Sequence, residues 1–243
     1  MDLKKDLKGV YKQVEMEERN QYYALAKLFQ YPTEGYIENV NACVGLLKEH
    51  YPEAAVEIAP FAALVNENSL DAIEEIFTRT FHIQAICYLD LGYVLFGEDY
   101  KRGEFLVNMK LEQRKVNHDC GEELPDNLAN VLILMAKTEE QEFLNELGAR
   151  IVIPSLGKML QEYDAARIEL KTKVMRKKHR AILQENLKGG IIYKHPLRAL
   201  LTVLQHDFKG IEYEVYNAMP SIGGDVLSNC VSCSVPSTNA TTT

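Results

Sequence analysis

The fold is decided by the run Ile83-Gln-Ala-Ile-Cys-Tyr-Leu-Asp-Leu-Gly-Tyr-Val-Leu-Phe-Gly97, in which Asp90 is the only formal charge. Apolar or aromatic side chains would occupy every face of a helix drawn through these residues, and such a helix has to be buried. The run is too short to cross a bilayer, which needs about 20 consecutive apolar residues. The sequence therefore predicts a central core helix, surrounded by other parts of the protein.

Asp90 needs compensation within this apolar run, because burying an isolated carboxylate is costly. One interpretation is a structural ion pair, with Arg102 or Arg79 as the partner. The other interpretation places Asp90 near a cleft, where it would contact a ligand. The sequence favours the ion pair and leaves both open.

Two further helices are predicted after this run. Gly97 accepts the left-handed conformation that ends a helix, and an amphipathic helix follows it. In the second helix, Pro125 fits the first turn and Asp126 complements the positive end of the helix dipole. The inward stripes expected for the two helices are Phe105, Leu106, Met109 and Gln113, and then Leu128, Val131, Leu132 and Met135.

The other periodic segments also predict helices, separated by Pro, Gly and capping residues. Ser69 is the expected N-cap of one of them. Pro60 is expected to break another, and Pro154 to kink a third. The predicted helices cover residues 15–30, 33–51, 53–66, 70–81, 139–163, 164–187 and 193–204.

These segments predict an all-α fold, a single-domain helical bundle, because no strand-like alternation of apolar and polar residues persists along the chain. The chain has 243 residues, 47% of them hydrophobic, enough to bury a substantial core. We assign the bundle to residues 1–206. Residues 207–243 lose the helical periodicity, and their Gly, Ser, Asn and Thr content predicts an irregular, disordered tail.

Charge and targeting signals restrict the class of partner. The net charge of −8 argues against a nucleic-acid surface and would attract a basic partner. The N-terminus has no apolar region of the secretory type, and no run is long enough to span a membrane. We therefore expect a cytoplasmic protein without stable membrane insertion. Its five cysteines are expected to be reduced there: Cys43, Cys87, Cys120, Cys230 and Cys233.

The sequence lacks several local motifs that are typical of catalytic sites: Glu-x-x-His, His-Glu-x-x-His, Gly-x-Ser-x-Gly and phosphate-binding loops. We therefore expect a protein that binds and does not catalyse. Two alternatives stay open. A helical metal-dependent enzyme can assemble its site from distant residues, and the basic run Lys171–Arg180 would suit a helical DNA-binding regulator.

Three segments carry a family resemblance: Thr78-Arg-Thr-Phe81, Tyr93-Val-Leu-Phe-Gly-Glu-Asp-Tyr-Lys-Arg-Gly103 and Glu123-Leu-Pro-Asp-Asn-Leu128. They resemble the cytoplasmic chaperones that mature molybdopterin enzymes, the nitrate reductase delta subunit and TorD-like group. The third segment is similar to the family's E-L-P-D-H-L signature, with Asn127 in the place of histidine. The resemblance covers residues 20–205 and favours the subgroup that serves type II enzymes of the dimethyl sulfoxide reductase family.

The resemblance implies an all-α bundle of the TorD-like type. Such a chaperone holds the N-terminal leader of an immature catalytic subunit until molybdopterin guanine dinucleotide has been inserted, and it delays twin-arginine transport of exported enzymes. The implied partner is the apo catalytic subunit of a molybdenum oxidoreductase. The client receives the cofactor, and none is bound tightly by the chaperone, which would be a monomer or a homodimer.

A short, basic leader that can form an amphipathic helix requires an apolar groove with an acidic rim. Glu122, Glu123 and Asp126 are expected to form that rim. Asp126 and Asn127 are also expected to hydrogen-bond to the peptide backbone or to an arginine. The candidate peptide-binding residues are Tyr93, Phe96, Arg102, Phe105, Met109, Glu123, Asp126 and Asn127.

Overall fold

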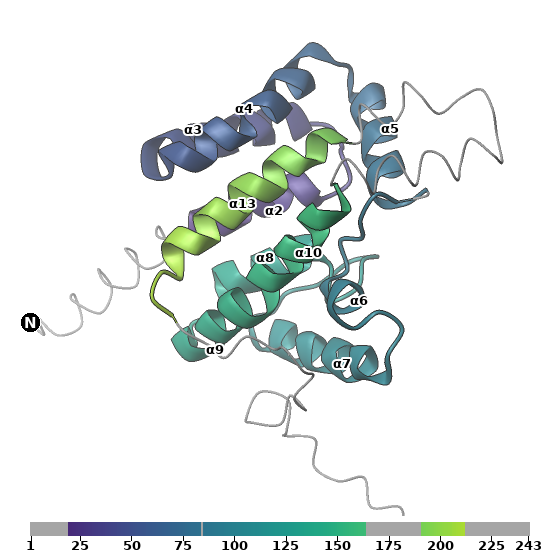
Figure 1. Cartoon of the computed structure of the whole chain (residues 1–243), viewed down its shortest axis with the longest axis vertical. Coiled ribbons are helices and arrows are strands. Elements are labelled where there is room, and N and C mark those ends of the chain that lie inside the picture. The colour runs from purple at the N-terminus through teal and green to yellow at the C-terminus, as the bar shows by residue number, and fades with distance from the viewer. Residues whose placement is uncertain (1–18, 84, 164–190, 212–243) are drawn as a thin grey trace, which may run out of the picture.

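The computed structural model describes residues 19–83, 85–163 and 191–211, and these ranges form an all-α helical bundle (Figure 1). The predicted fold class is confirmed. Within the described ranges there is no strand, and an isolated antiparallel bridge joins Asp90 to Asn127. The elements are α2 (Asn20–Ala26), η1 (Lys27–Phe29), α3 (Tyr36–His50), α4 (Pro52–Glu67), α5 (Leu70–Phe81), α6 (Leu91–Phe96), α7 (Tyr100–Lys115), α8 (Leu128–Lys137), α9 (Gln141–Glu146), η2 (Leu147–Val152), α10 (Ile153–Glu162), η3 (Ile191–Tyr193) and α13 (Lys194–Asp207).

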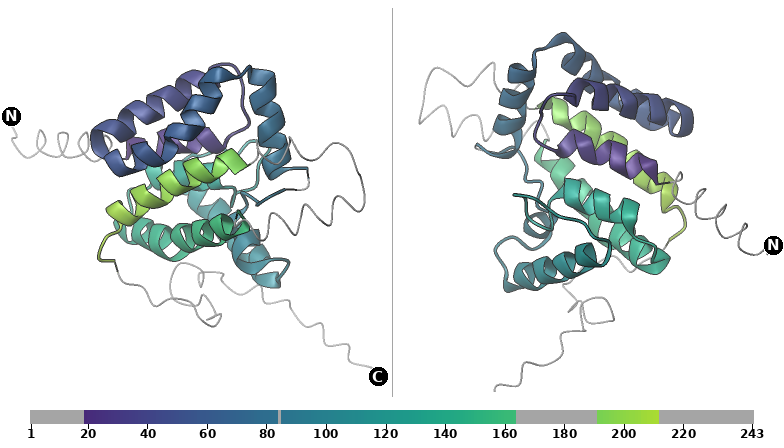
Figure 2. Two further views of the ribbon diagram at one scale, coloured as in Figure 1. Left: turned by 45° about the horizontal axis from the view of Figure 1, so that its top comes forward. Right: turned by 180° about the vertical axis from the view of Figure 1, so that it is seen from behind.

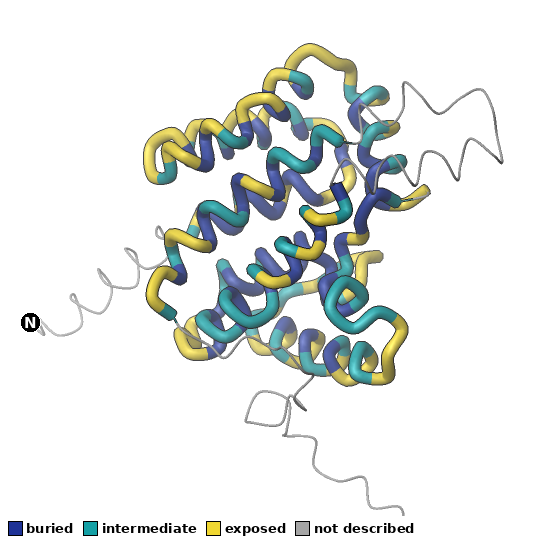
Figure 3. Tube along the Cα trace, in the orientation of Figure 1, coloured by how far each residue is buried: buried dark blue, intermediate teal, exposed yellow. Residues whose placement is uncertain are grey.

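The helices are arranged around α13, which packs against α4 and α10. Helix α2 lies beside α8, and α3 packs against both α2 and α4 (Figure 2). Helix α7 packs against α6 at the end of the bundle opposite α3 (Figure 1). Figure 3 shows that the buried faces of these helices turn toward one another. No helix in the described ranges is both long enough and apolar enough to span a lipid bilayer.

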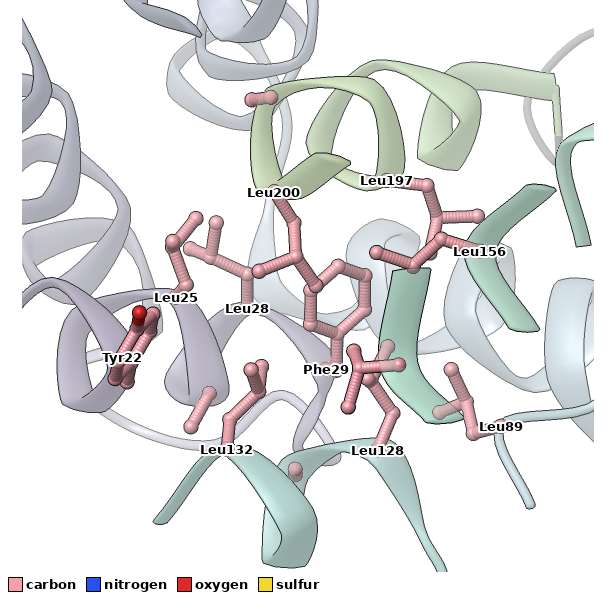
Figure 4. Close-up of a cluster of buried hydrophobic side chains, with 14 of the residues drawn as sticks. Tyr22, Leu25, Leu28, Phe29, Leu89, Leu128, Leu132, Leu156, Leu197 and Leu200 are labelled. Carbon is pink, nitrogen blue, oxygen red and sulfur yellow. The ribbon is translucent and has the colours of Figure 1, made fainter. Parts of the chain in front are cut away.

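The core is built from apolar residues that recur at helical spacing and therefore face inward from each helix. Figure 4 shows Leu28 and Phe29 meeting Leu128 of α8, Leu156 of α10 and Leu200 of α13, and each of the five is at most 1% exposed. Most of the two stripes predicted after the central run is confirmed. Their buried members are Phe105, Met109, Gln113, Leu128, Val131, Leu132 and Met135.

Several local signals act as the sequence predicts. Ser69 caps α5, since its Oγ accepts a hydrogen bond from the Ala72 backbone N–H at 3.4 Å. Gly97 ends α6 with a φ of +65°, which favours glycine. The helical stretch α9–η2–α10 contains a π-helical segment, η2, which ends at Val152, two residues before Pro154. The kink at Pro154 stays a prediction.

The predicted central core helix is wrong for the first half of its run. Helix α6 covers only Leu91–Phe96, and the described residues of the run before it, Ile83 and residues 85–90, are not helical. Within that part, Ile83 is 64% exposed, whereas Ile86 and Leu89 are buried. Periodicity alone cannot distinguish a short apolar run in a buried extended segment from one in a buried helix.

Backbone pairing with a distant segment explains why the chain is not helical here, since it holds Asp90 in an extended backbone conformation. Residues 88–90, which end in this residue, are called the extended segment below. The Leu128 N–H donates to the Leu89 carbonyl, and the Leu91 N–H donates to the Asp126 carbonyl, both at 2.9 Å. These two bonds flank the bridge between Asp90 and Asn127. They satisfy buried backbone groups that a helix would otherwise have paired within itself.

Two prolines also depart from the prediction. Helix α4 runs through Pro60 without a break, because Pro60 lies on an exposed face where the unpaired carbonyl one turn earlier can hydrogen-bond to water. Pro125 lies before α8 and not in its first turn. Asn127 is the N-cap, and its Oδ1 accepts a hydrogen bond from the Ala129 N–H at 3.0 Å.

The folded region extends past residue 206. The carboxylate of Asp207 accepts hydrogen bonds from Gln21 Nε2 at 3.0 Å, from the Tyr22 hydroxyl at 2.9 Å and from the Tyr51 hydroxyl at 2.8 Å. The end of α13 is thereby joined to α2 and to the junction of α3 and α4. The predicted helix 164–187, the basic run within it and residues 212–243, with Cys230 and Cys233, lie outside the described residues.

Candidate functional site

A pocket of about 370 Å³ lies between η1, α5, the extended segment before α6 and the start of α8. Aromatic rings form much of its wall: Phe29, Tyr31, Phe77, Phe81 and Tyr88. Two of them are also accessible from solvent, since Tyr31 is 49% and Tyr88 46% exposed. The pocket therefore offers apolar, aromatic surface to a ligand that enters from the outside.

The local structure explains how these rings come together. Phe77 and Phe81 are one turn apart on α5, and their ring centroids lie 5.0 Å apart in an edge-to-face arrangement. Tyr31, which follows η1, packs edge-to-face on Phe77 with centroids 5.7 Å apart. The extended segment brings Tyr88 and the buried Leu89 to the same pocket.

The other part of the wall is polar and acidic. Asp90, Glu123, Asn127 and Asn130 line it, and neither Lys nor Arg is among the lining residues within the described ranges. Asn127 Nδ2 donates to Glu123 Oε2 at 3.3 Å. The Asn130 amide donates to the Leu124 carbonyl at 3.0 Å, which fixes the loop that carries Glu123. The pocket thus places two carboxylates beside the aromatic rings.

Asp90 also belongs to a charged cluster outside the pocket lining, which it forms with Arg102 and the ring of Tyr93. Arg102 Nη2 is 3.4 Å from Asp90 Oδ2, so the structural ion pair predicted for Asp90 is present. Arg79 pairs with Glu75 instead. Asp90 also lines the pocket, so it combines the predicted ion pair with the predicted place near a cleft. The Arg102 guanidinium lies over the Tyr93 ring, 5.3 Å from its centroid.

The placement of Asp126 on an exposed acidic rim is wrong, because its side chain is fully buried. The pairing of residues 126–128 with 89–91 draws it inside, where Oδ2 accepts a hydrogen bond from the Gly92 N–H at 3.0 Å. Its Oδ1 has no hydrogen-bond partner among the described residues. Burial, reinforced by the nearby Asp90 carboxylate, raises the pKa of Asp126 to about 6.

The other candidate residues fall into two groups. Glu123 and Asn127 line the pocket. Phe105 and Met109 are buried in the core, and Tyr93, Phe96 and Arg102 are partly buried, outside the lining of the pocket. This pocket lies beside η1, α5 and the extended segment, and not between the central helix and the Phe105 helix. The aromatic residues that the prediction missed are Phe29, Tyr31, Phe77, Phe81 and Tyr88.

Asp126→Asn is expected to change how stability depends on pH. The raised pKa of Asp126, about 6 against an ordinary 3.8, means that the folded state binds this proton more tightly than the unfolded state. The free energy of unfolding therefore falls as the pH rises from about 4 to about 6, by about 2 to 3 kcal/mol from this group. Asparagine keeps an oxygen for the Gly92 N–H and does not titrate.

Urea unfolding of both proteins across this pH range tests the expectation. The stability of Asp126→Asn relative to the unsubstituted protein should rise with pH. Titration of Asp90, whose pKa is raised by its burial, is present in both proteins, so the comparison isolates Asp126 to first order. Parallel pH profiles would contradict the expectation.

Among the described residues no group of three or more His, Cys, Asp and Glu side chains is placed to hold a metal ion. The basic run that suggested DNA binding is not described. No family model matches the chain, and the comparison with curated proteins finds none that is similar to it. A proposal for its function therefore rests on the pocket and on the three resembling segments.

Proposed function

We propose that the protein is an assembly chaperone, which binds the N-terminal leader of the immature catalytic subunit of a molybdopterin oxidoreductase before the cofactor is inserted. The supporting observation is the pocket, in which aromatic rings and the two carboxylates of Asp90 and Glu123 lie together, with no Lys or Arg among the lining residues that the structure describes. A leader of this kind is basic and amphipathic, so its apolar and cationic side chains match the two kinds of wall. The identity of the client comes from the family resemblance.

The surface around the pocket suits a peptide longer than the pocket itself. Ile83 and Leu124 follow the lining residues His82 and Glu123 in the sequence, and they are 64% and 42% exposed. Covering such apolar side chains stabilises a complex by about 25 cal/mol per Å² removed from water. Micromolar affinity, about −8 kcal/mol, requires only a few such contacts and permits the release that a chaperone needs.

Tyr88→Ala is expected to weaken leader binding by about tenfold, because an aromatic anchor at a binding site contributes 1 kcal/mol or more, by order of magnitude. The probe is a fluorescein-labelled peptide that copies the twin-arginine leader of a molybdopterin oxidoreductase, measured by fluorescence anisotropy. Added salt should also weaken binding, since two carboxylates face the peptide.

Tyr100→Ala is the matched control, because Tyr100 is 91% exposed on α7 and does not line the pocket. Its affinity for the leader should equal that of the unsubstituted protein, and a scrambled peptide of the same composition should bind more weakly to all three. Failure of leaders from several molybdenum enzymes to bind would reject the proposed function. An equal loss of leader affinity in Tyr88→Ala and Tyr100→Ala would show that the pocket is not the binding site for the leader.

A further inference from the structure

Asp90 lies between the pocket and the charged cluster behind it. Its carboxylate lines the pocket, whereas its partner Arg102, with Nη2 at 3.4 Å, does not. The Arg102 guanidinium also lies over the ring of Tyr93, 5.3 Å from the centroid. The protein therefore already binds one guanidinium at this place by combining a carboxylate with an aromatic ring.

The pocket side of Asp90 offers the same two kinds of partner a second time. Tyr88 supplies the ring, held against Tyr93 with centroids 4.6 Å apart and 46% exposed. Glu123 supplies a second carboxylate, and its hydrogen bond from Asn127 uses Oε2. Tyr88, Asp90 and Glu123 all line the pocket, so a ligand bound in it would lie beside all three residues.

The charges around Asp90 do not balance within the described part of the chain. The single guanidinium of Arg102 acts on two carboxylates, those of Asp90 and Asp126, and Glu123 adds a third nearby. Burial raises the pKa of Asp90, Arg102 opposes the rise, Glu123 adds to it and His82 also opposes it. Among the described residues that line the pocket, His82 is the only one that can carry a positive charge. A cation that enters the pocket is therefore favoured.

We propose that the pocket binds the side chain of one arginine of the bound leader, with its guanidinium against the Tyr88 ring and hydrogen-bonded to the carboxylates of Asp90 and Glu123. The proposal rests on the proposed function for the source of the arginine. A guanidinium is planar and carries five N–H donors, so it can stack on a ring and bind two carboxylates together. A lysine ammonium is a compact charge that lacks this planar stacking.

The test replaces each arginine of the labelled leader in turn by citrulline, which keeps the shape and removes the charge, and by lysine. One position is expected at which citrulline weakens binding about tenfold and lysine weakens it by a smaller factor. The protein variants are Asp90→Asn and Glu123→Gln. In each of them the citrulline peptide at that position should lose only about twofold relative to the arginine peptide.

Asp71→Asn is the matched control, since Asp71 is exposed on α5 and does not line the pocket. It should keep the full tenfold difference between the arginine and citrulline peptides. Because Asp90→Asn also leaves Arg102 without its partner, Glu123→Gln, a change at an exposed residue, keeps the test valid if the first variant is unstable. Thermal unfolding of each variant identifies that case.

Two outcomes distinguish failure of the arginine site from failure of the proposed function. If the leader binds and no citrulline replacement depends on Asp90 or Glu123, the arginine site is wrong and the chaperone proposal stands. If no leader binds, the proposed function fails, and N-acetylarginine amide titrated at millimolar concentration decides the site alone. Weaker binding of that probe to Glu123→Gln than to Asp71→Asn would support the arginine site, and equal or undetectable binding would overturn it.

Discussion

Gly148→Ala is expected to lower the free energy of unfolding by about 3 kcal/mol, because overpacking of a buried position costs this much. An alanine Cβ at this position would lie 2.4 Å from Cε2 and Cζ of Phe208. Gly148 is in the π-helical segment η2, and Phe208 is 6% exposed against the core. The ring cannot move away from Cβ without losing its own buried contacts.

Urea unfolding measures the effect, with Gly157→Ala as the control. Gly157 lies in α10, and an added Cβ there meets nothing within 4 Å. Because alanine favours the helix more than glycine, Gly157→Ala should be neutral or more stable by up to about 1 kcal/mol. Replacing the ring by a smaller side chain, in the double variant Gly148→Ala/Phe208→Leu, should recover part of the lost stability. Equal stability of the two alanine variants would show that the ring yields without cost.

Gly92→Ala is expected to destabilise the protein by about 3 kcal/mol and also to weaken leader binding. The new Cβ would lie 2.7 Å from Asp126 Oδ2 and 2.9 Å from Cδ1 of Phe105. Both side chains are buried, so the Asp126 carboxylate has to leave the Gly92 N–H, to which it is bonded at 3.0 Å. A lost hydrogen bond to a buried charge adds to the cost of overpacking.

The effect on binding follows from the place of Gly92 in α6, two residues after Asp90, which lines the pocket. Gly103→Ala is the control for both measurements, since Gly103 is exposed on α7 and an added Cβ meets nothing within 4 Å. It should be at least as stable as the unsubstituted protein and bind the leader equally well. A Gly92→Ala protein with unchanged stability would mean that Asp126 is not held as the structure places it.

Helical periodicity predicted the fold class because most of the bundle is formed by amphipathic helices, in which local spacing determines the buried face. It failed between Ile83 and Asp90, where pairing with residues 126–128 replaces the helix. No local pattern can predict pairing with a segment that is almost 40 residues away in the chain. Closing a loop of this length depends on tertiary contacts. The same pairing moved Asp126 from the expected rim into the interior.

The pocket was predicted only in its acidic part. Glu123 and Asn127 stood out because they are polar residues next to a helix start. Phe77 and Phe81 fit the pattern of ordinary core residues, and Tyr31 and Tyr88 belong to no periodic stripe. Their common wall arises only when η1, α5 and the extended segment come together. An aromatic wall assembled from three separate segments leaves no spacing signal in the sequence.

The carboxylate of Asp207 has a practical bearing on shortened forms of the protein. Periodicity alone would place the last useful residue at 206, and trimming there would deprive two tyrosine hydroxyls and the Gln21 amide of their shared acceptor. Those donors would then lie beside a new chain end, where α13 meets α2 and the junction of α3 and α4. A fragment made for crystallisation should therefore end after Ile211, and a C-terminal tag should be attached after this residue.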